Sequence, residues 1–115
     1  MSVMRRVLVL LTVPAVLAAL AIPALAATKS VTVGDDYFVR DSGVPTITVK
    51  KNDTVKWKFQ GDSPHNVTVK TGPVKFKSST KTSGSYSKKV TKAGLYRIYC
   101  TIHDGQKMNL RVKSK

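Results

Sequence analysis

The sequence predicts an all-β protein, an antiparallel Greek-key β-sandwich of about seven to eight strands. Two observations predict this fold. Short runs of alternating apolar and polar residues recur after residue 28, and turn-forming Gly, Pro, Asn and Asp residues separate them. No stretch in this part shows the apolar period of a long helix. With 115 residues, the chain is long enough for one small domain.

Each expected strand has one apolar face, because side chains alternate between the two faces of a strand. The segment 51–53 (KND) supplies a turn before the third run. Residues 71–87 are rich in Lys, Ser, Thr and Gly, and they are expected to form a loop with one or two edge strands. The inward-facing residues of the successive runs are Val31 and Val33; Ile47 and Val49; Val55, Trp57 and Phe59; His65, Val67 and Val69; Tyr96, Ile98 and Cys100; and Met108, Leu110 and Val112.

A secretory signal peptide is predicted at residues 1–26. Two arginines precede a long uncharged stretch of Val, Leu and Ala, which ends in Ala24-Leu25-Ala26. This order of positive, apolar and small residues is typical of a signal peptide. Cleavage after Ala26 leaves a mature domain at 27–115 that works outside the cytoplasm, in the periplasm or beyond it. The uncharged stretch is also long enough to span a bilayer, so a retained segment that tethers the domain to the membrane is the alternative.

The residues that carry chemistry are the only cysteine, both histidines and a methionine. One cysteine excludes an internal disulfide framework and a four-cysteine metal site. Cys100, His103 and Met108 form a Cys-x2-His-x4-Met pattern, and His65 lies 35 residues before Cys100. Cys100 ends one expected strand, His103 lies on the turn and Met108 begins the next strand, so one hairpin can present three ligands. Two imidazoles, a thiolate and a thioether are the ligands of a mononuclear blue-copper site.

Each of these residues also has a purely structural interpretation. A lone cysteine is often a small buried hydrophobic residue. An inward histidine is commonly a hydrogen-bonded core residue, and a methionine at the head of an apolar strand face fits a core. The conjunction favours the metal, because the cysteine and both histidines converge with an export signal and a sandwich pattern.

Three segments carry a family resemblance: 45–57 (PTITVKKNDTVKW), 64–67 (PHNV) and 94–103 (GLYRIYCTIH). Through them the chain resembles the cupredoxins, the blue-copper proteins, and within these the small bacterial plastocyanin- and amicyanin-like proteins. The resemblance implies a cupredoxin fold with one type 1 copper ion, held by His65, Cys100 and His103. It also implies that Asn66 ties the two ligand loops together. His103 would be the ligand nearest the surface, where electrons enter and leave.

The axial ligand of the copper is open between two residues. Plastocyanin-like proteins have four residues between the second histidine and the axial methionine, which selects Met108. Amicyanin-like proteins have two, which places Gln106 at the axial position. Both residue types are axial ligands in blue-copper sites. Met108 is expected because a thioether is the commoner choice, and Gln106 is the alternative, which would lower the reduction potential.

The sequence thus predicts a one-electron carrier that cycles copper between Cu(I) and Cu(II), and not an enzyme, because nothing else in it forms a second metal site or an acid–base pair. Two alternatives remain. The first is a carrier or buffer that delivers copper to an oxidase. The second is a metal-free, cupredoxin-like domain that binds surfaces.

The charge of the chain predicts its partners. It has 20 Lys and Arg residues against 6 acids, for a formal net charge of +14. This excess favours electrostatic steering toward an acidic redox protein, or retention at an anionic membrane or cell-wall surface. Nucleic acid is not expected as a partner, because the chain has an export signal and no nucleic-acid-binding motif. We expect a monomer.

Overall fold

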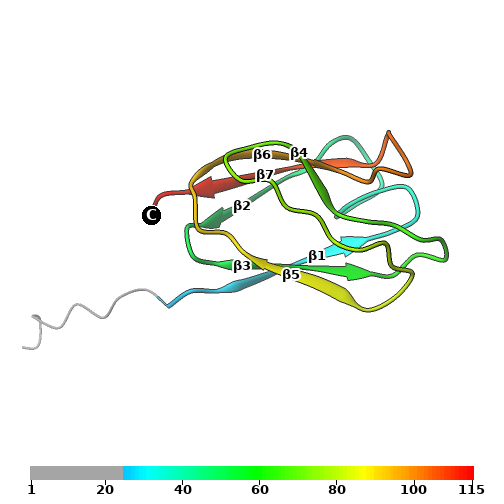
Figure 1. Cartoon of the computed structure of the whole chain (residues 1–115), viewed down its shortest axis with the longest axis horizontal. Helices are drawn as coiled ribbons and strands as arrows, with labels where there is room; N and C mark the ends of the chain where they lie inside the picture. Colours follow the sequence, from blue (N-terminus) through cyan, green and yellow to red (C-terminus); the bar gives the residue numbers. More distant parts are fainter. Residues whose placement is uncertain (1–24) are drawn as a thin grey trace, which may run out of the picture.

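The computed structural model describes residues 25–115, which form a sandwich of two β-sheets (Figure 1). Within this part of the chain, no helix is long and apolar enough to cross a bilayer. The predicted leader, and with it the alternative of a retained anchor, lies outside the described residues except for its last two positions. The strands are β1 (Thr28–Val33), β2 (Thr46–Lys50), β3 (Thr54–Phe59), β4 (Thr68–Thr71), β5 (Ser85–Lys89), β6 (Gly94–Tyr99) and β7 (Lys107–Lys113).

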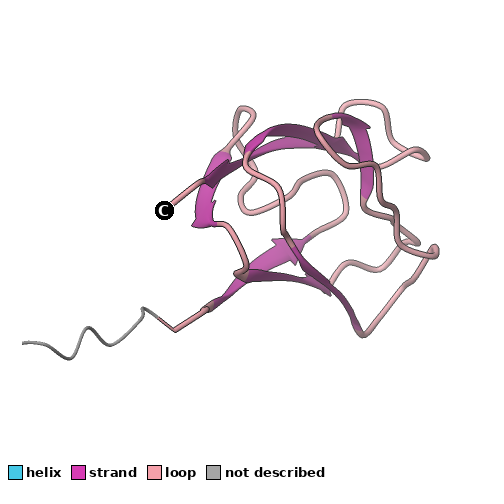
Figure 2. Cartoon of the chain, turned by 60° about the vertical axis from the view of Figure 1, so that its left-hand side comes forward, coloured by secondary structure: helices cyan, strands magenta, loops and turns pink. Residues whose placement is uncertain are grey.

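One sheet has three strands in the order β1-β3-β5, and the other has four in the order β2-β7-β6-β4. Figure 2 shows the two sheets facing each other across the interior. The predicted all-β sandwich is therefore confirmed. β5 is an edge strand, as the composition of residues 71–87 suggested.

The prediction that the pairing is antiparallel throughout is wrong for two strand pairs. β1 pairs with β3, and β2 with β7, in parallel register, whereas the remaining three pairings are antiparallel. The reason is the path of the chain between the sheets. The chain leaves β1, runs as β2 in the opposite sheet and returns as β3, so it comes back pointing in its first direction. The turn between β2 and β3 depends on Asn52, whose φ of 78° lies in the left-handed region.

The interior is filled by the residues that alternation predicted. Trp57, Tyr96 and Leu110 are at most 1% exposed, and they come from both sheets. Val74, Phe76 and Tyr86 are partly buried against this core. The core joins the two sheets into one unit, so loops at the ends of different strands keep fixed positions relative to one another.

Three of these loops lie at the same end of the sandwich (Figure 1). They are the loop that follows β1, the segment that precedes β4 and the connection between β6 and β7. The predicted ligands lie on the last two of these segments, because His65 precedes β4 and Cys100 follows β6 directly. The strands thus bring together residues that are 35 positions apart in the sequence.

Candidate metal centre

Three potential metal ligands meet at this loop end of the sandwich. The ligand atoms of His65, Cys100 and His103 all lie within 4.8 Å of one another. The Cys100 Sγ atom is 3.9 Å from Nδ1 of His65 and 3.8 Å from Nδ1 of His103. The two imidazole rings are 4.8 Å apart between centroids and are tilted by 44°. One cation between these atoms would have a sulfur and two nitrogen neighbours.

The loop between β6 and β7 is closed by its own backbone. The Cys100 N–H donates to the Gln106 carbonyl at 3.1 Å, and the Gln106 N–H donates to the His103 carbonyl at 2.9 Å. The His103 N–H in turn donates to the Cys100 carbonyl at 3.2 Å. These bonds fold the loop tightly, so that the side chains of Cys100 and His103 point to a common place. The hairpin expected from the sequence is present here.

His65 reaches the same place from a separate segment. Its backbone forms a two-way bridge with Lys81, with N···O distances of 2.9 and 2.8 Å, and its side chain is fully buried. The Nε2 atom lies 3.2 Å from Oδ1 of Asp35. A carboxylate only accepts hydrogen bonds, so Nε2 carries a proton, and in the neutral imidazole Nδ1 is then the nitrogen with the lone pair. The free lone pair is on the nitrogen that faces the Cys100 sulfur.

Asp35 is held in place by two backbone donors as well. Its Oδ1 atom accepts the N–H groups of Asp62 at 2.8 Å and Ser63 at 3.0 Å. The Ser63 N–H and then the His65 side chain lower the pKa of the Asp35 carboxyl below its ordinary value. The group is therefore ionised at neutral pH and orients the imidazole. Asp35 was not identified from the sequence as part of the site. Its only signal in the sequence is its position, since it follows the Val31–Val33 run and Gly34.

Asn66 links the two ligand-bearing segments. Its Nδ2 atom donates to Oγ1 of Thr101 at 2.8 Å, and its Oδ1 atom accepts the Thr101 N–H at 3.2 Å and the Thr68 hydroxyl at 2.7 Å. The side chain is 5% exposed. Because Thr101 follows Cys100, this amide fixes the cysteine loop against the segment that carries His65.

The two candidates for the axial position have different surroundings. The Met108 Sδ atom lies 3.4 Å from the indole Nε1 of Trp57, which donates to it in the core. The Gln106 Nε2 atom donates to the carbonyl oxygens of Gly34 and Tyr37, at 2.9 Å each. These two acceptors require the amide nitrogen on their side, which fixes the orientation of the amide. In the described part of the chain, the buried Gln106 Oε1 atom has no hydrogen-bond partner.

The three candidate ligands differ in their exposure. His65 and Cys100 are fully buried, whereas His103 is half-buried. The neighbour Ile102 is 51% exposed, and Asp104 is exposed as well. His103 is therefore the residue of this group nearest to solvent. The exposed residues beside it are thus both apolar and charged.

The donor set fits copper. A cysteine sulfur is a soft ligand that suits Cu(I), and imidazole nitrogens suit Cu(II). Each imidazole presents Nδ1 to the Cys100 sulfur, and His65 is held in the required tautomer by Asp35. The buried Gln106 Oε1 atom, which has no donor within residues 25–115, lies on the same loop as Cys100 and His103.

The family of the chain follows from comparison with known proteins. Residues 42–115 match the family described as copper binding proteins of the plastocyanin/azurin family. The match covers more than half of the chain, and the chain belongs to this family. It is a cupredoxin-like copper protein that binds one copper ion. A search of curated protein sequences found no match.

Solved structures of amicyanin are similar to this chain over most of their length. A methionine-to-glutamine variant of amicyanin in the Cu(I) form is 29% identical, with a TM-score of 0.64, and the match covers 75% of this chain and 82% of that one. A methionine-to-alanine variant in the Cu(I) form is 26% identical, with a TM-score of 0.65 and coverages of 79% and 87%. A copper-containing nitrite reductase from Thermus scotoductus SA-01 is 20% identical, with a TM-score of 0.63, over 84% of this chain and 25% of that one. The last similarity shows the fold alone.

Replacement of Asn66 by alanine tests the link between the two ligand-bearing segments. We expect Asn66→Ala to lower the free energy of unfolding by about 1–3 kcal/mol, because it removes the three hydrogen bonds that the buried Asn66 amide makes to Thr101 and Thr68. The matched control is Asn109→Ala, whose side chain makes one exposed contact of 3.5 Å to Thr46. We expect the control to cost less than about 0.5 kcal/mol in urea unfolding. Equal costs for the two variants would show that Asn66 does not link the loops.

Proposed function

We propose that the protein is a one-electron carrier outside the cytoplasm, whose type 1 copper ion is bound by His65, Cys100 and His103. The observation that carries the proposal is the meeting of the three ligand atoms within 4.8 Å at the loop end of the sandwich. Copper bound there would cycle between Cu(I) and Cu(II). The protein would accept an electron from one partner and pass it to another.

The residues around the ligands favour rapid electron transfer. The loop that holds Cys100 and His103 is closed by backbone hydrogen bonds, and Asn66 and Asp35 fasten the segment that holds His65. Ligands held in this way move little when the charge at the site changes. A small rearrangement lowers the barrier for electron transfer. The half-buried His103 is the proposed entry and exit point for electrons.

We prefer a carrier to the other functions. An enzyme would need a substrate site beside the metal, and the polar groups that surround the ligands here are engaged in holding the loops. A protein that delivers copper must release it, whereas His65 and Cys100 are fully buried and fixed by hydrogen bonds. A metal-free, surface-binding domain would have no use for this convergence of ligands.

Titration of the purified, exported protein with Cu(II) tests the proposal. We expect an intense visible thiolate-to-copper absorption band that saturates at one equivalent, because one cysteine sulfur lies at the site. Cys100→Ser is expected to lose the band completely. Ser78→Ala, which changes a buried polar residue outside the ligand set, is the control and should keep it.

Two results would contradict the proposal. A colourless protein with one equivalent of bound copper would exclude a type 1 site. Rapid loss of the bound copper to a chelator, together with slow electron self-exchange, would favour copper delivery instead.

We further propose that the axial position belongs to Gln106 rather than to Met108. The Met108 sulfur already accepts a hydrogen bond from Trp57, whereas the Gln106 Oε1 atom is buried without a donor, and its amide is held by two carbonyl groups. A buried acceptor without a partner is costly, and coordination of a metal would satisfy it. Two residues separate His103 from Gln106, and this is the spacing expected for an amicyanin-like axial ligand. The similar amicyanin structure in which glutamine replaces a methionine is itself a Cu(I) form.

Reduction potentials of two variants distinguish the two axial candidates. We expect Gln106→Met to raise the potential by more than about 59 mV, a tenfold change in relative affinity for the two oxidation states. The reason is that a thioether favours Cu(I) more than an amide oxygen does. Met108→Leu, which keeps the volume of the core residue, should shift the potential by much less. The reverse order of the two shifts would assign the axial position to Met108.

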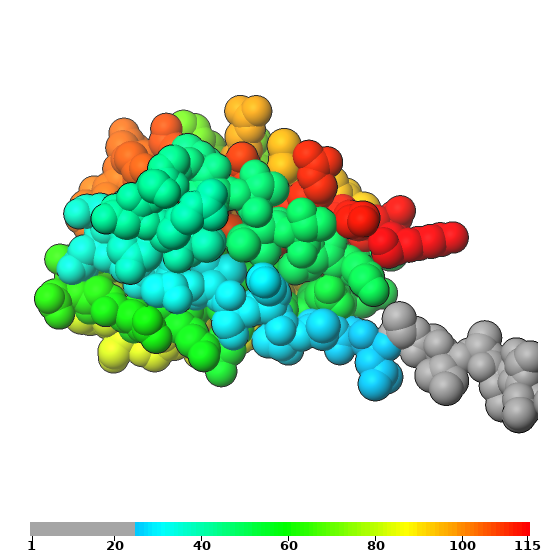
Figure 3. Space-filling model, turned by 180° about the vertical axis from the view of Figure 1, so that it is seen from behind, coloured from blue at the N-terminus to red at the C-terminus, as the bar shows by residue number. Residues whose placement is uncertain are grey.

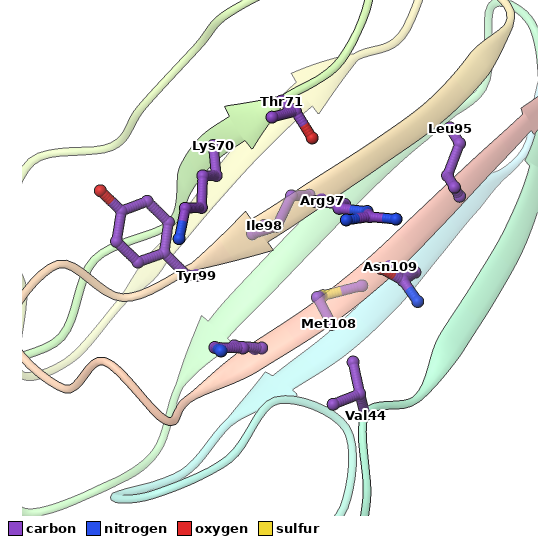
Figure 4. Close-up of a pocket in the computed structure, with 10 residues that line it drawn as sticks. Val44, Lys70, Thr71, Leu95, Arg97, Ile98, Tyr99, Met108 and Asn109 are labelled. Carbon is purple, nitrogen blue, oxygen red and sulfur yellow. The ribbon is translucent and has the colours of Figure 1, made fainter.

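An acidic redox partner is proposed to dock on the outer face of the four-stranded sheet. A groove there is lined by residues of β4, β6 and β7 (Figure 4). The lining includes the cations Lys70, Arg97 and Lys107 but no acid, and it includes the exposed apolar side chains of Val44 and Leu95. Charge complementarity to this groove favours a protein with an acidic surface over an anionic lipid or wall polymer, because the apolar residues suit a protein contact.

The rate of oxidation by ferricyanide, an anionic probe, tests the steering by these cations. We expect the rate to fall about tenfold from low to high salt, because salt screens the attraction. Lys70→Glu and Lys107→Glu should lower the rate at low salt more than Lys29→Glu does, because Lys29 lies near the far end of β1. Equal effects of the three variants would exclude local steering by the groove.

The proposed location outside the cytoplasm rests on the leader-like residues 1–26 and on the chain's likeness to amicyanins. The proposal requires that the leader be removed or that it hold the domain at the outer face of the membrane.

A further inference from the structure

The hydrogen bonds that hold the N-terminal segment to the domain begin at Ala27 in the described part of the chain. The Thr54 N–H donates to the Ala27 carbonyl at 2.9 Å, which starts the pairing of β1 with β3. The Ala27 N–H donates to Oδ1 of Asp53, also at 2.9 Å. Leu25 and Ala26 are exposed. Ala27 is also the first residue after the cleavage site that the sequence predicts.

Asp53 is built into the fold as an acceptor. It is 8% exposed, and its second oxygen, Oδ2, accepts the Lys50 N–H at 2.9 Å. The N–H of Ala27, and then that of Lys50, lower the pKa of this carboxyl below its ordinary value. Asp53 is therefore an anion at neutral pH, and one of its two oxygens is aimed at the backbone nitrogen of Ala27.

We propose that a signal peptidase hydrolyses the Ala26–Ala27 bond and that the new α-ammonium group of Ala27 forms an ion pair with the carboxylate of Asp53. In the hydrolysis, water supplies the hydroxyl of the new Ala26 carboxyl group and the hydrogen of the new amine. At neutral pH that amine takes up a further proton. A single N–H donor is thereby replaced by a charged group at the same position, opposite an anion already in place.

The ion pair would lock the start of β1 after export. The acceptor is already charged before cleavage, and the ammonium group adds the attraction between opposite charges to this hydrogen bond. Figure 3 shows that the start of the described chain and the C terminus lie at the same end of the molecule. Three lysines, Lys50, Lys51 and Lys115, line the hollow around Asp53 together with Leu25, Ala26 and Asn52. This inference rests on the proposed export of the protein but not on copper binding, since the candidate metal centre lies at the other end of β1.

The first experiment is the intact mass of the exported protein. The full chain is expressed with its own leader in a bacterial host, and the protein is purified from the periplasm. We expect the mass of residues 27–115, with Ala27 as the first residue in N-terminal sequencing. A mature chain that starts at another residue, or a chain that keeps the leader, would overturn the proposal.

The second experiment separates the ammonium group from an ordinary N–H donor. Insertion of one glycine between Ala26 and Ala27 keeps the N–H of Ala27 but moves the free amine away by one residue. We expect the melting temperature of this variant, once processed after Ala26, to be about 4–8 °C lower at pH 7. Asp53→Asn should lower the melting temperature of the native mature chain more than that of the glycine variant. Asp41→Asn, which removes an exposed acid, is the charge-matched control and should affect both chains equally.

The pH dependence supplies a readout that a merely structural role of Asp53 would not give. The carboxylate raises the pKa of the α-ammonium above its ordinary value of about 7.7–8.0. Stability from a raised pKa is present at lower pH and is lost as the pH rises through the folded-state value. The other charged groups here are Lys50, Lys51, Lys113, Lys115 and the terminal carboxylate, and they are the same in the native and glycine variants.

The difference in melting temperature between the native and glycine variants should therefore shrink between about pH 7 and pH 9. A difference that is absent at pH 7, or that stays the same at both pH values, would show that the amine is not paired with Asp53. Equal losses on Asp53→Asn in both chains would lead to the same conclusion. These outcomes are independent of copper loading, so they do not test the electron-transfer proposal.

Discussion

The geometry of the candidate metal centre depends on one carboxylate oxygen. Oδ1 of Asp35 collects three donors, which are the backbone N–H groups of Asp62 and Ser63 and the imidazole Nε2 of His65. With Nε2 so engaged, the buried ring of His65 cannot rotate without breaking its hydrogen bond to a carboxylate. Its Nδ1 atom is then fixed opposite the Cys100 sulfur. The hydrogen bonds of Asn66 and Gln106 then hold the loop between β6 and β7 against the segments that carry His65 and Asp35.

Gln106 joins the second loop to the same support. Its amide nitrogen donates to carbonyl groups of the loop after β1, the loop that also carries Asp35. Its backbone carbonyl accepts the N–H of Cys100. One residue therefore couples the position of the cysteine to that of the loop that orients His65. Because the three loops share these contacts, a change in charge at the site is met by a connected network rather than by three independent loops.

The sequence predicted best what depends on local pattern. Alternation identified the inward residues of each strand, and the order of Cys100 and His103 along one hairpin placed both on the correct loop. The fully buried position of His65 followed from parity with Val67 and Val69. These features could be predicted because the side-chain period of a strand is two and because neighbouring residues of a hairpin stay together.

The features that the sequence did not predict depend on which segments meet in space. Alternation does not say which strand pairs with which, so the parallel pairing of β1 with β3 was missed. Asp35 contacts a residue 30 positions away, and no motif joins the two. The donor that Trp57 presents to the Met108 sulfur is another such contact. The spacing after His103 left Met108 and Gln106 as axial candidates. Their different hydrogen bonds could be seen only in the folded chain.

β1 connects the two ends of the sandwich. Ala27, directly before β1, donates to Asp53, and the last residues of β1 lead into Gly34 and the Asp35 loop at the candidate metal centre. β1 is an edge strand with a single partner, so it has fewer hydrogen bonds to hold it than a central strand has. Any displacement of β1 along β3 would move Asp35 away from His65. A firm attachment at the beginning of β1 therefore contributes to the ligand geometry at its end, although the two points lie at opposite ends of the sandwich.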